Sequence, residues 1–262
     1  MVTRVIAVSN HKGGVGKTTS TINIGAGLSI IGNNKNMCKH ILLIDLDPQA
    51  NLTQSLGVNP EKTVYGSLRG EYPLTPIEIT PTLDLIASTI DLSGAEIELS
   101  GEAGREFVLR DLIEPLKKKY DYILIDCPPS LGLLTLNALT ASDEVYIPLQ
   151  TQYLALQGLT KLIEIVDKVK KRLNKKLCIG GVILTQYDSR KVLDKDIALS
   201  ITNHFKEKVF NTKIRNNVSL AEAPSAGKDI FRYNPKSFGA EDYQSLCEEI
   251  LQRTTEHEEV TA

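Results

Sequence analysis

Short apolar runs alternate with longer amphipathic segments along most of the chain. Runs that are rich in Val, Ile and Leu at nearly every position are typical of strands buried on both faces, as in a parallel sheet. Strands are predicted in the runs RVIAVSN from Arg4, ILLID from Ile41, LDLIAS from Leu83, YILID from Tyr122, EVYIPLQ from Glu144 and IGGVILT from Ile179. Because each run is followed by enough chain for a crossover, the pattern predicts an α/β fold with a doubly wound, mostly parallel sheet and helices on both faces.

Helical periodicity is clear in residues 18–31, 106–119 and 156–173. No repeat, low-complexity tract or flexible linker divides the chain, so we expect a single domain over residues 1–250. The polar stretch GNNKNMCKH from Gly32 is expected to protrude as a loop. The acidic, non-periodic end of the chain, residues 251–262, is expected to fray.

The composition is that of a soluble globular protein, with 42% hydrophobic and 24% charged residues in 262. No apolar run reaches the ~18 residues that predict a membrane span, and a strand pattern begins too early for a secretory signal. The four cysteines are far apart and form no C-x-x-C pair, which argues against a zinc site or a disulfide framework. A reduced, cytoplasmic setting is therefore expected.

A glycine-rich loop follows the first predicted strand in the stretch HKGGVGKTTS. Its end matches the phosphate-binding pattern G-x-x-x-x-G-K-S/T, although His11 occupies the outer glycine position and Lys12 is an additional lysine. Between a strand and a helix, the backbone N–H groups of residues 14–18 converge on phosphate oxygens. Lys17 then reaches the β- and γ-phosphates and Thr18 is a ligand for Mg²⁺, so ATP and Mg²⁺ are the predicted cofactors.

Aspartates end two of the predicted strands. Asp45 and Asp47 lie in ILLIDLDPQAN, and Asp126 begins DCPPSLG. In a doubly wound sheet these carboxylates lie at the edge where ligands bind. Asp126 is the natural Walker-B aspartate, which holds Mg²⁺ directly or through water. The residues alone leave the choice between Asp45 and Asp47 open.

Together these motifs resemble the ParA/MinD family of deviant Walker-A ATPases, and within it the ParA (Soj) branch. The resemblance extends from Val5 to about Gly239 and rests on KGGVGKTT, LLIDLDPQAN, YILIDCPPSLG, PLQTQYLALQGL, GVILTQYD and NVSLAEAPSAGK in this order. It implies that Lys12 crosses a two-fold interface to the phosphates of a second subunit. Since Mg²⁺-bound ATP keeps about two negative charges, two facing nucleotides need such additional cations to associate.

The resemblance also implies a role for each residue of the site. Catalytic roles fall to Lys12, Lys17 and Asp47, where Asp47 resembles the switch aspartate that orients water and Asp45 is its buried partner. Residues 126–132 resemble the second switch loop. Metal ligation is implied for Thr18, Asp47 and Asp126. Nucleotide contacts are implied for Gly13, Gly14, Val15, Gly16, Lys17, Thr18 and Thr19 at the phosphates, and for Gln186, Asn216 and Pro224 near adenine.

In this branch the ATP-bound homodimer binds double-stranded DNA without sequence preference, and a ParB-like partner stimulates hydrolysis to segregate plasmid or chromosomal DNA. The charge distribution agrees, because residues 161–236 hold 17 basic and 8 acidic residues in a chain of net charge −2. The DNA-binding candidates are Lys170, Lys171, Arg172, Lys206, Lys208, Lys213, Arg215, Lys228 and Arg232, of which Lys213 and Arg215 are favoured. A cytoplasmic, nucleoid-associated protein is therefore expected.

Two departures and two alternatives accompany this interpretation. Ser219 stands where many relatives have a basic residue, and Gln152 and Gln157 stand where they commonly have glutamate. A ParA-like ATPase that positions a protein cargo would carry the same motifs. A MinD-like ATPase that cycles on membranes would need a basic amphipathic helix at the end of the chain, whereas residues 237–262 hold 1 basic and 7 acidic residues. No membrane partner is therefore expected.

Overall fold

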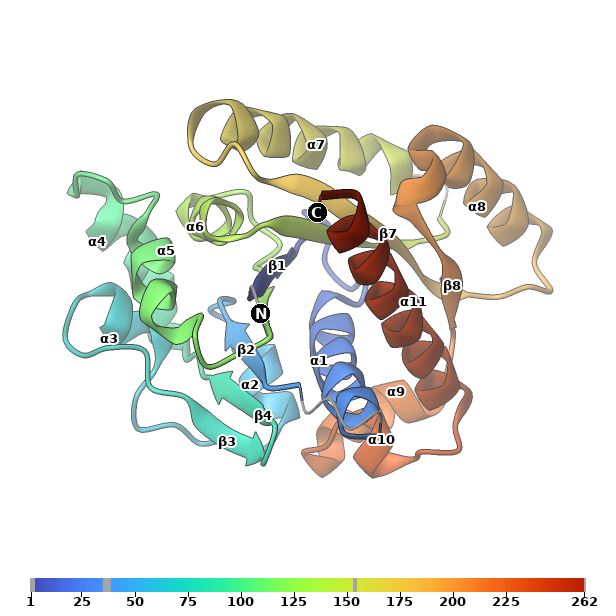
Figure 1. Ribbon diagram of the computed structural model, residues 1–262, viewed down its shortest axis with the longest axis horizontal. Coiled ribbons are helices and arrows are strands. Elements are labelled where there is room, and N and C mark those ends of the chain that lie inside the picture. Colours follow the sequence, from blue (N-terminus) through green and yellow to red (C-terminus); the bar gives the residue numbers. More distant parts are fainter. Residues whose placement is uncertain (1–2, 35–38, 153–154, 262) are drawn as a thin grey trace.

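The computed structural model describes residues 3–34, 39–152 and 155–261, and the side chains of 32–34, 155–158 and 256–261 are outside this description. The described residues form one sheet in the order β3-β4-β2-β5-β1-β6-β7-β8 (Figure 1). The strands are β1 (Arg4–Val8), β2 (Ile41–Asp45), β3 (Ile77–Thr80), β4 (Leu83–Ile86), β5 (Tyr122–Asp126), β6 (Glu144–Gln150), β7 (Cys178–Tyr187) and β8 (Val209–Arg215).

Helices connect the strands. The α-helices are α1 (Lys17–Asn34), α2 (Asn51–Ser55), α3 (Val64–Leu68), α4 (Ala95–Glu98), α5 (Val108–Ile113), α6 (Leu133–Ala141), α7 (Ala155–Arg172), α8 (Val192–Phe205), α9 (Val218–Glu222), α10 (Ile230–Tyr233) and α11 (Phe238–Thr261). Short 3-10 turns are η1 (Ile90–Gly94), η2 (Leu99–Gly101), η3 (Glu114–Leu116), η4 (Lys206–Lys208) and η5 (Ala223–Ala226).

The predicted doubly wound, mostly parallel sheet is confirmed. Each of the six predicted strands is present, and each strand pair is parallel except β3 with β4. Alternate residues of β1 face opposite sides: Val5 and Ala7 join one hydrophobic core, and Ile6 and Val8 join the other. In Figure 1, α1 and α11 lie side by side over one face, and α6 and α7 lie on the other side of the sheet.

The two strands at the edges of the sheet, β3 and β8, were not predicted. Each contains polar residues that interrupt the apolar run, because an edge strand is less completely buried. Along β8, side chains of α11 accept the outward N–H groups. Glu249 accepts from Asn211 N at 2.9 Å and from Thr212 N at 3.0 Å. Inward carboxylates of this kind prevent a second chain from pairing with the edge.

The helix ends differ from the predicted ones where proline or packing intervenes. The helix predicted over residues 106–119 is limited to α5 and the 3-10 turn η3, because Pro115 cannot donate the backbone hydrogen bond that would continue it. Helix α11 continues through Thr261, so the backbone of residues 251–261 is helical where fraying was expected. The loop was expected to begin at Gly32, but α1 continues through Asn34. Residues 35–38 of the expected loop lie outside the described residues.

The described helices include none that combines the length and the hydropathy needed to span a bilayer.

Strands β1, β2 and β5 are adjacent and parallel, with Val8 and Asp45 both in register with Asp126. Their carboxyl ends therefore meet at one edge of the sheet, beside the amino end of α1. The candidate site lies at this edge.

Candidate nucleotide site

Side chains from neighbouring strands fix the loop between β1 and α1 by donating hydrogen bonds to its carbonyl groups. The Gly14 carbonyl accepts hydrogen bonds from the side chains of Gln150 at 2.9 Å and Gln186 at 3.1 Å, and the Val15 carbonyl accepts from Thr185 Oγ1 at 2.8 Å. Gly14 and Gly16 have φ angles of 72° and 88°, which other residues adopt only with strain. Within the described residues no acceptor takes the N–H groups of Gly13–Gly16, so these four donors remain for a bound anion.

The two lysines of the loop have different surroundings. Lys17 is 7% exposed and its ammonium donates to the Lys12 carbonyl at 3.2 Å. Burial lowers the pKa of Lys17, although the negative charge of Asp126 opposes this shift. The ammonium of Lys12 instead donates to the Gln152 side chain at 2.6 Å, in an exposed position. Lys17 lines the cavity described below, whereas the described lining does not include Lys12.

Oxygen atoms suited to Mg²⁺ converge at the end of β5. Asp126 is fully buried, and Thr18 donates to its carboxylate at 2.7 Å. Burial and the neighbouring Asp45 carboxylate raise the pKa of Asp126 well above its usual range. Among the described residues no group of three or more His, Cys, Asp or Glu side chains forms a metal site. One hydroxyl and one carboxylate fit Mg²⁺ bound to a nucleotide, because phosphates and water supply its other ligands.

Asp45 and Asp47, which the sequence did not distinguish, have different environments. Asp45 is buried and accepts from Thr53 N at 2.9 Å, Thr53 Oγ1 at 2.7 Å and Asp47 N at 3.2 Å. Its burial raises the pKa to about 6. Asp47 is 6% exposed, lines the cavity and accepts from Gln49 N at 2.9 Å. The geometry therefore gives Asp45 a supporting position and turns Asp47 toward the ligand space.

Two neighbouring cavities provide space for a nucleotide. The first, of about 400 Å³, is lined by the glycine loop, Lys17, Thr18, Thr19 and Asp47, with Gln49, Pro224 and Lys228 on its other walls. The second, of about 240 Å³, lies between the ends of β7 and β8 and includes Asn216 and Tyr243. Gly16, Thr19, Gln186 and Leu220 line both. Of the three predicted adenine contacts, Gln186 and Asn216 line the second cavity, whereas Pro224 lies on the wall of the first.

Sequence reasoning missed several residues of the site. Asn217 lines the second cavity, and its buried Oδ1 has no hydrogen-bond donor among the described residues. Asn10 fixes the start of the loop, because its side chain donates to the Pro148 carbonyl at 2.7 Å and accepts from Lys12 N at 3.1 Å. The signal for Asn217 was present in the motif NVSLAEAP. The sequence around Asn10 gave no such signal, because a polar residue at the end of a predicted strand does not by itself indicate a site.

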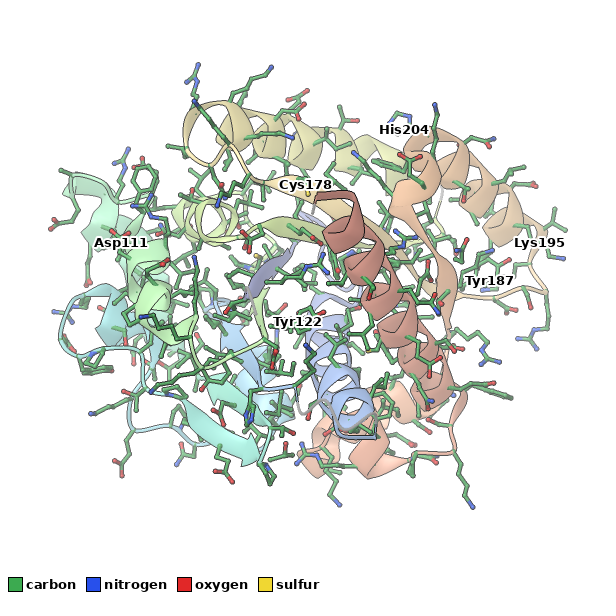
Figure 2. All side chains as sticks on the ribbon, viewed as in Figure 1. Asp111, Tyr122, Cys178, Tyr187, Lys195 and His204 are labelled. Carbon is green, nitrogen blue, oxygen red and sulfur yellow. The ribbon has the colours of Figure 1, made fainter. Side chains whose placement is uncertain are left out.

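The nine DNA-binding candidates do not form one surface. Lys170, Lys171 and Arg172 are exposed in the last turn of α7. Lys206 and Lys208 line a cavity at the amino ends of β6–β8, on the opposite edge of the sheet from the nucleotide cavities. Lys213, which lies nearer the carboxyl end of β8, also lines this cavity. The ammonium of Lys213 lies 4.6 Å from the ring centroid of Tyr187, at the end of β7 (Figure 2).

Three of these candidates have other contacts. Arg215, one of the two favoured residues, bonds to Asp242 at 2.6 Å and to Glu241 at 2.7 Å. Arg232 is paired with Asp229, and Lys228 lines the nucleotide cavity. The expectation that Arg215 is a principal DNA contact is therefore not supported, because its charge is balanced within the chain by residues far away in the sequence.

Comparisons with known proteins agree with this geometry. The family model of an AAA domain matches residues 3–179. The chain is 48% identical to the sporulation initiation inhibitor protein Soj of Bacillus subtilis, with 94% of this chain and 98% of that protein covered. It is 46% identical to the chromosome-partitioning ATPase Soj of Treponema pallidum, with 95% and 98% covered. Cobyrinic acid a,c-diamide synthase of Mycobacterium smegmatis, solved with an ATP analog and magnesium, superimposes with a TM-score of 0.84 at 35% identity over 97% of this chain and 96% of that one.

Proposed function

The chain belongs to the ParA/MinD family of ATPases, in its ParA (Soj) branch, and on that premise we propose that it is a DNA-partition switch controlled by ATP. Its ATP-bound form is a homodimer that binds double-stranded DNA without sequence preference. A ParB-like partner stimulates hydrolysis and releases the DNA. The cargo that this cycle moves is plasmid or chromosomal DNA, and the protein acts in the cytoplasm on the nucleoid.

The observation that carries this proposal is the separation of the two loop lysines. Lys17 is buried on the wall of its own phosphate cavity. Lys12 is held on the outside of the loop by Gln152, where a second protomer can approach it. A cation in this position offsets the negative phosphate charge of a facing subunit, as an arginine supplied in trans does. ATP thereby stabilises the dimer, and the dimer completes the active site.

The residues of this chain have distinct tasks in hydrolysis. ATP supplies the phosphoryl group that is transferred to water, and Mg²⁺ neutralises charge on its phosphates. Thr18 and Asp126 hold the metal, and the free N–H groups of the glycine loop hold the phosphates. Asp47 orients the attacking water as a hydrogen-bond acceptor. Asp45 positions this loop by accepting from Asp47 N and from Thr53. Slow turnover without a partner is expected of such a switch.

DNA binding is assigned to the exposed lysines of the basic segment, chiefly Lys170 and Lys171. Neutralisation of phosphates is the main source of non-specific affinity, and a dimer doubles the number of contacts. Ser219, where relatives commonly have a basic residue, accepts a hydrogen bond from Asn234 at 3.2 Å and adds no charge. We therefore expect weaker DNA binding than a basic residue at this position would give.

The proposal is tested by retention of the pure protein on unrelated duplex DNA with ATP, ADP or no nucleotide, over a range of salt concentrations. Retention that requires ATP and falls steeply with salt is the expected result. Lys17→Ala, which loses the phosphate contact, is the control and should not be retained. The DNA-binding part of the proposal is wrong if ATP produces dimers but the protein is not retained on DNA with ATP, with ADP or without nucleotide.

A further inference from the structure

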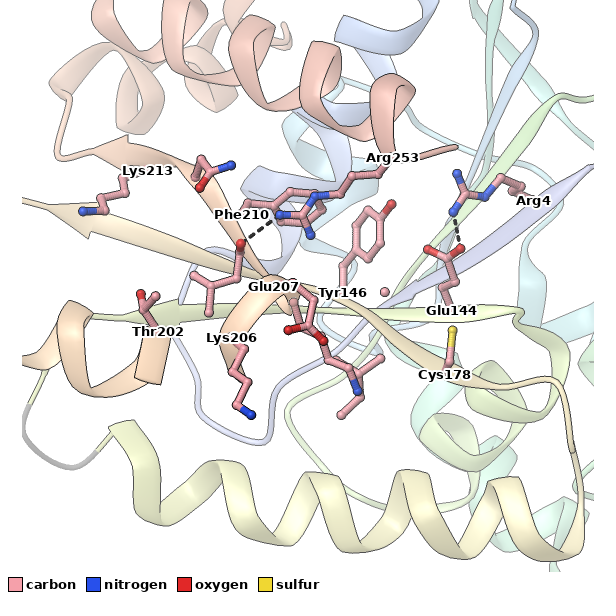
Figure 3. A pocket seen from close by; sticks show the side chains of 15 residues that line it. Arg4, Glu144, Tyr146, Cys178, Thr202, Lys206, Glu207, Phe210, Lys213 and Arg253 are labelled. Atoms are coloured by element: carbon pink, nitrogen blue, oxygen red, sulfur yellow. Dashed lines mark hydrogen bonds and ion pairs between the residues drawn. The ribbon is translucent and has the colours of Figure 1, made fainter. Parts of the chain in front are cut away.

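A short helix, α4, contacts the far end of the loop that follows Asp126. The segment of η1 and α4 leaves the sheet after β4, whose carboxyl end lies at the same edge as that of β2. This is the edge of the nucleotide cavities, opposite to the cavity at the amino ends of β6–β8 (Figure 3). Helix α4 lies against α6 (Figure 1). The loop of residues 127–132 connects β5 to α6, and its Pro129 lines the phosphate cavity. An element that positions the start of α6 therefore also positions a wall of the nucleotide site.

Glu96 of α4 provides a cap that the residues next to α6 do not. The N-cap residue of α6 is Gly132, and no side chain caps this helix locally. Glu96 Oε1 instead accepts a hydrogen bond from Leu134 N at 3.3 Å, across 38 positions of the sequence. A carboxylate at the amino end of a helix satisfies a free N–H group and interacts favourably with the helix dipole. The contact therefore fixes the amino end of α6 to α4.

Gly132 leaves the space that the Glu96 carboxylate occupies. Its φ of −87° and ψ of −161° are extended values that any residue adopts, so the backbone does not require glycine at this position. A Cβ atom on Gly132 would overlap Oε1 of Glu96 and would lie 2.8 Å from its Cδ. A larger residue would therefore displace the carboxylate from Leu134 N. Glycine here serves the contact between α4 and α6.

Other contacts hold the rest of α6 in place. Asn137, one turn further along the helix, accepts from Leu109 N at 3.1 Å and donates to the Arg105 carbonyl at 2.8 Å. At the near end of the loop, Cys127 N donates to the Val8 carbonyl at 3.2 Å. Replacement of Glu96 should therefore leave the helix on the sheet. Its effect should be confined to the first turn of α6 and to the loop that precedes it.

We propose that Glu96 is a positioning residue for ATP hydrolysis, which holds the loop of residues 127–132 against the nucleotide through its contact with the amino end of α6. ATP affinity does not depend on this contact, because Lys17 and the free N–H groups of the glycine loop bind the phosphates from other elements. Hydrolysis depends on it, because this loop begins at Asp126 and carries Pro129. A displacement of about 1 Å near reacting groups slows a reaction as much as a hundredfold. The proposal rests on the ATPase activity and is independent of DNA binding.

The test is the rate of phosphate release in a single turnover, measured together with the affinity for ATP by filter binding. Glu96→Ala should release phosphate about ten- to a hundredfold more slowly, with its ATP affinity unchanged. Glu96→Gln keeps an acceptor for Leu134 N and should restore most of the rate. Glu98→Ala is the matched control, because Glu98 is exposed on the same turn and accepts from the Tyr65 hydroxyl at 2.8 Å. This variant should hydrolyse ATP as the wild type does.

A further variant separates positioning from helix stability. Gly132→Ser in the Glu96→Ala background gives α6 a local cap, because residue 132 has the extended backbone of a capping serine and Glu96 no longer fills the space. It should restore the midpoint of thermal unfolding but not the rate. Recovery of the rate would overturn the proposal, since the contact would then serve only to stabilise the helix. A wild-type rate in Glu96→Ala, or an equal loss in Glu98→Ala, would also overturn it. These outcomes are independent of retention on DNA, which tests the partition function separately.

Discussion

The ammonium group of Lys12 donates a hydrogen bond to the carboxamide oxygen of Gln152 at 2.6 Å, on the exposed side of the glycine loop. Gln152 lies just beyond the end of β6, the strand whose last residue, Gln150, holds the Gly14 carbonyl. The same short segment therefore fixes the shape of the loop and the direction of its additional lysine. In a protein whose Lys12 acts on a second subunit, this contact must break when the dimer forms.

Replacement of Gln152 by alanine should make ATP-dependent dimerisation tighter. The contact is exposed, so its loss removes only about 0.5–1 kcal/mol from each monomer. Because both protomers break this contact, the dimer dissociation constant should fall roughly five- to thirtyfold. Analytical ultracentrifugation with ATP measures this change. Gln244→Ala on α11, which removes an exposed carboxamide elsewhere, is the matched control. Weaker dimerisation in Gln152→Ala would mean that Gln152 contributes to the interface itself.

Asp47→Ala should bind ATP normally and hydrolyse it at least about a hundredfold more slowly, because a positioned acceptor for the attacking water is lost. Phosphate release in single-turnover experiments gives the rate, and a filter-binding assay gives the affinity. Asp111→Ala removes an exposed carboxylate from α5 (Figure 2) and should leave both unchanged. Normal turnover in Asp47→Ala would mean that another residue orients the attacking water.

Asp45 should make the stability of the nucleotide-free protein depend on pH. Burial raises its pKa from 3.8 to about 6, so the folded state favours the neutral acid. Its contribution to stability is full below the unfolded pKa and is lost as the pH rises through the folded one. Relative to Asp45→Asn, which does not titrate, the wild type should gain about 1.4 kcal/mol between pH 8 and pH 5. Urea unfolding of both proteins measures this gain, and parallel pH profiles would contradict it.

Lys170→Ala combined with Lys171→Ala should weaken DNA binding of the ATP form about equally for all sequences. Each lost phosphate contact lowers the slope of log affinity against log salt by about 0.9. Salt-dependent fluorescence anisotropy with two unrelated duplexes measures both effects. Lys118→Ala combined with Lys119→Ala matches the charge change from exposed positions in the turn before β5, and this variant is expected to bind as the wild type does. An unchanged slope in the first variant would place the DNA surface elsewhere.

The sequence predicted the central strands well because burial on both faces leaves runs such as ILLID and YILID with no charged position before the final aspartate. It failed at β3 and β8, where an edge strand is only partly buried and its polar residues read as loop. The glycine loop and Asp126 were predictable because their spacing is local. The choice between Asp45 and Asp47 required the tertiary contact with Thr53.

Charge along the chain was a poorer guide than charge in space. Arg215 belongs to the basic segment of the sequence, but its partner Asp242 comes from α11 and cancels its charge. Lys228 belongs to the same segment and faces the nucleotide cavity.

The central claim is that Lys12 acts across a dimer that ATP assembles, and Lys12→Ala tests it most directly. We would determine molar mass by light scattering with Mg²⁺ and ATP in the Asp47→Ala background, which keeps ATP intact, with and without Lys12→Ala. The account predicts dimers for Asp47→Ala alone, and ATP-bound monomers once Lys12 is also replaced. Dimers of undiminished stability in the double variant would contradict it.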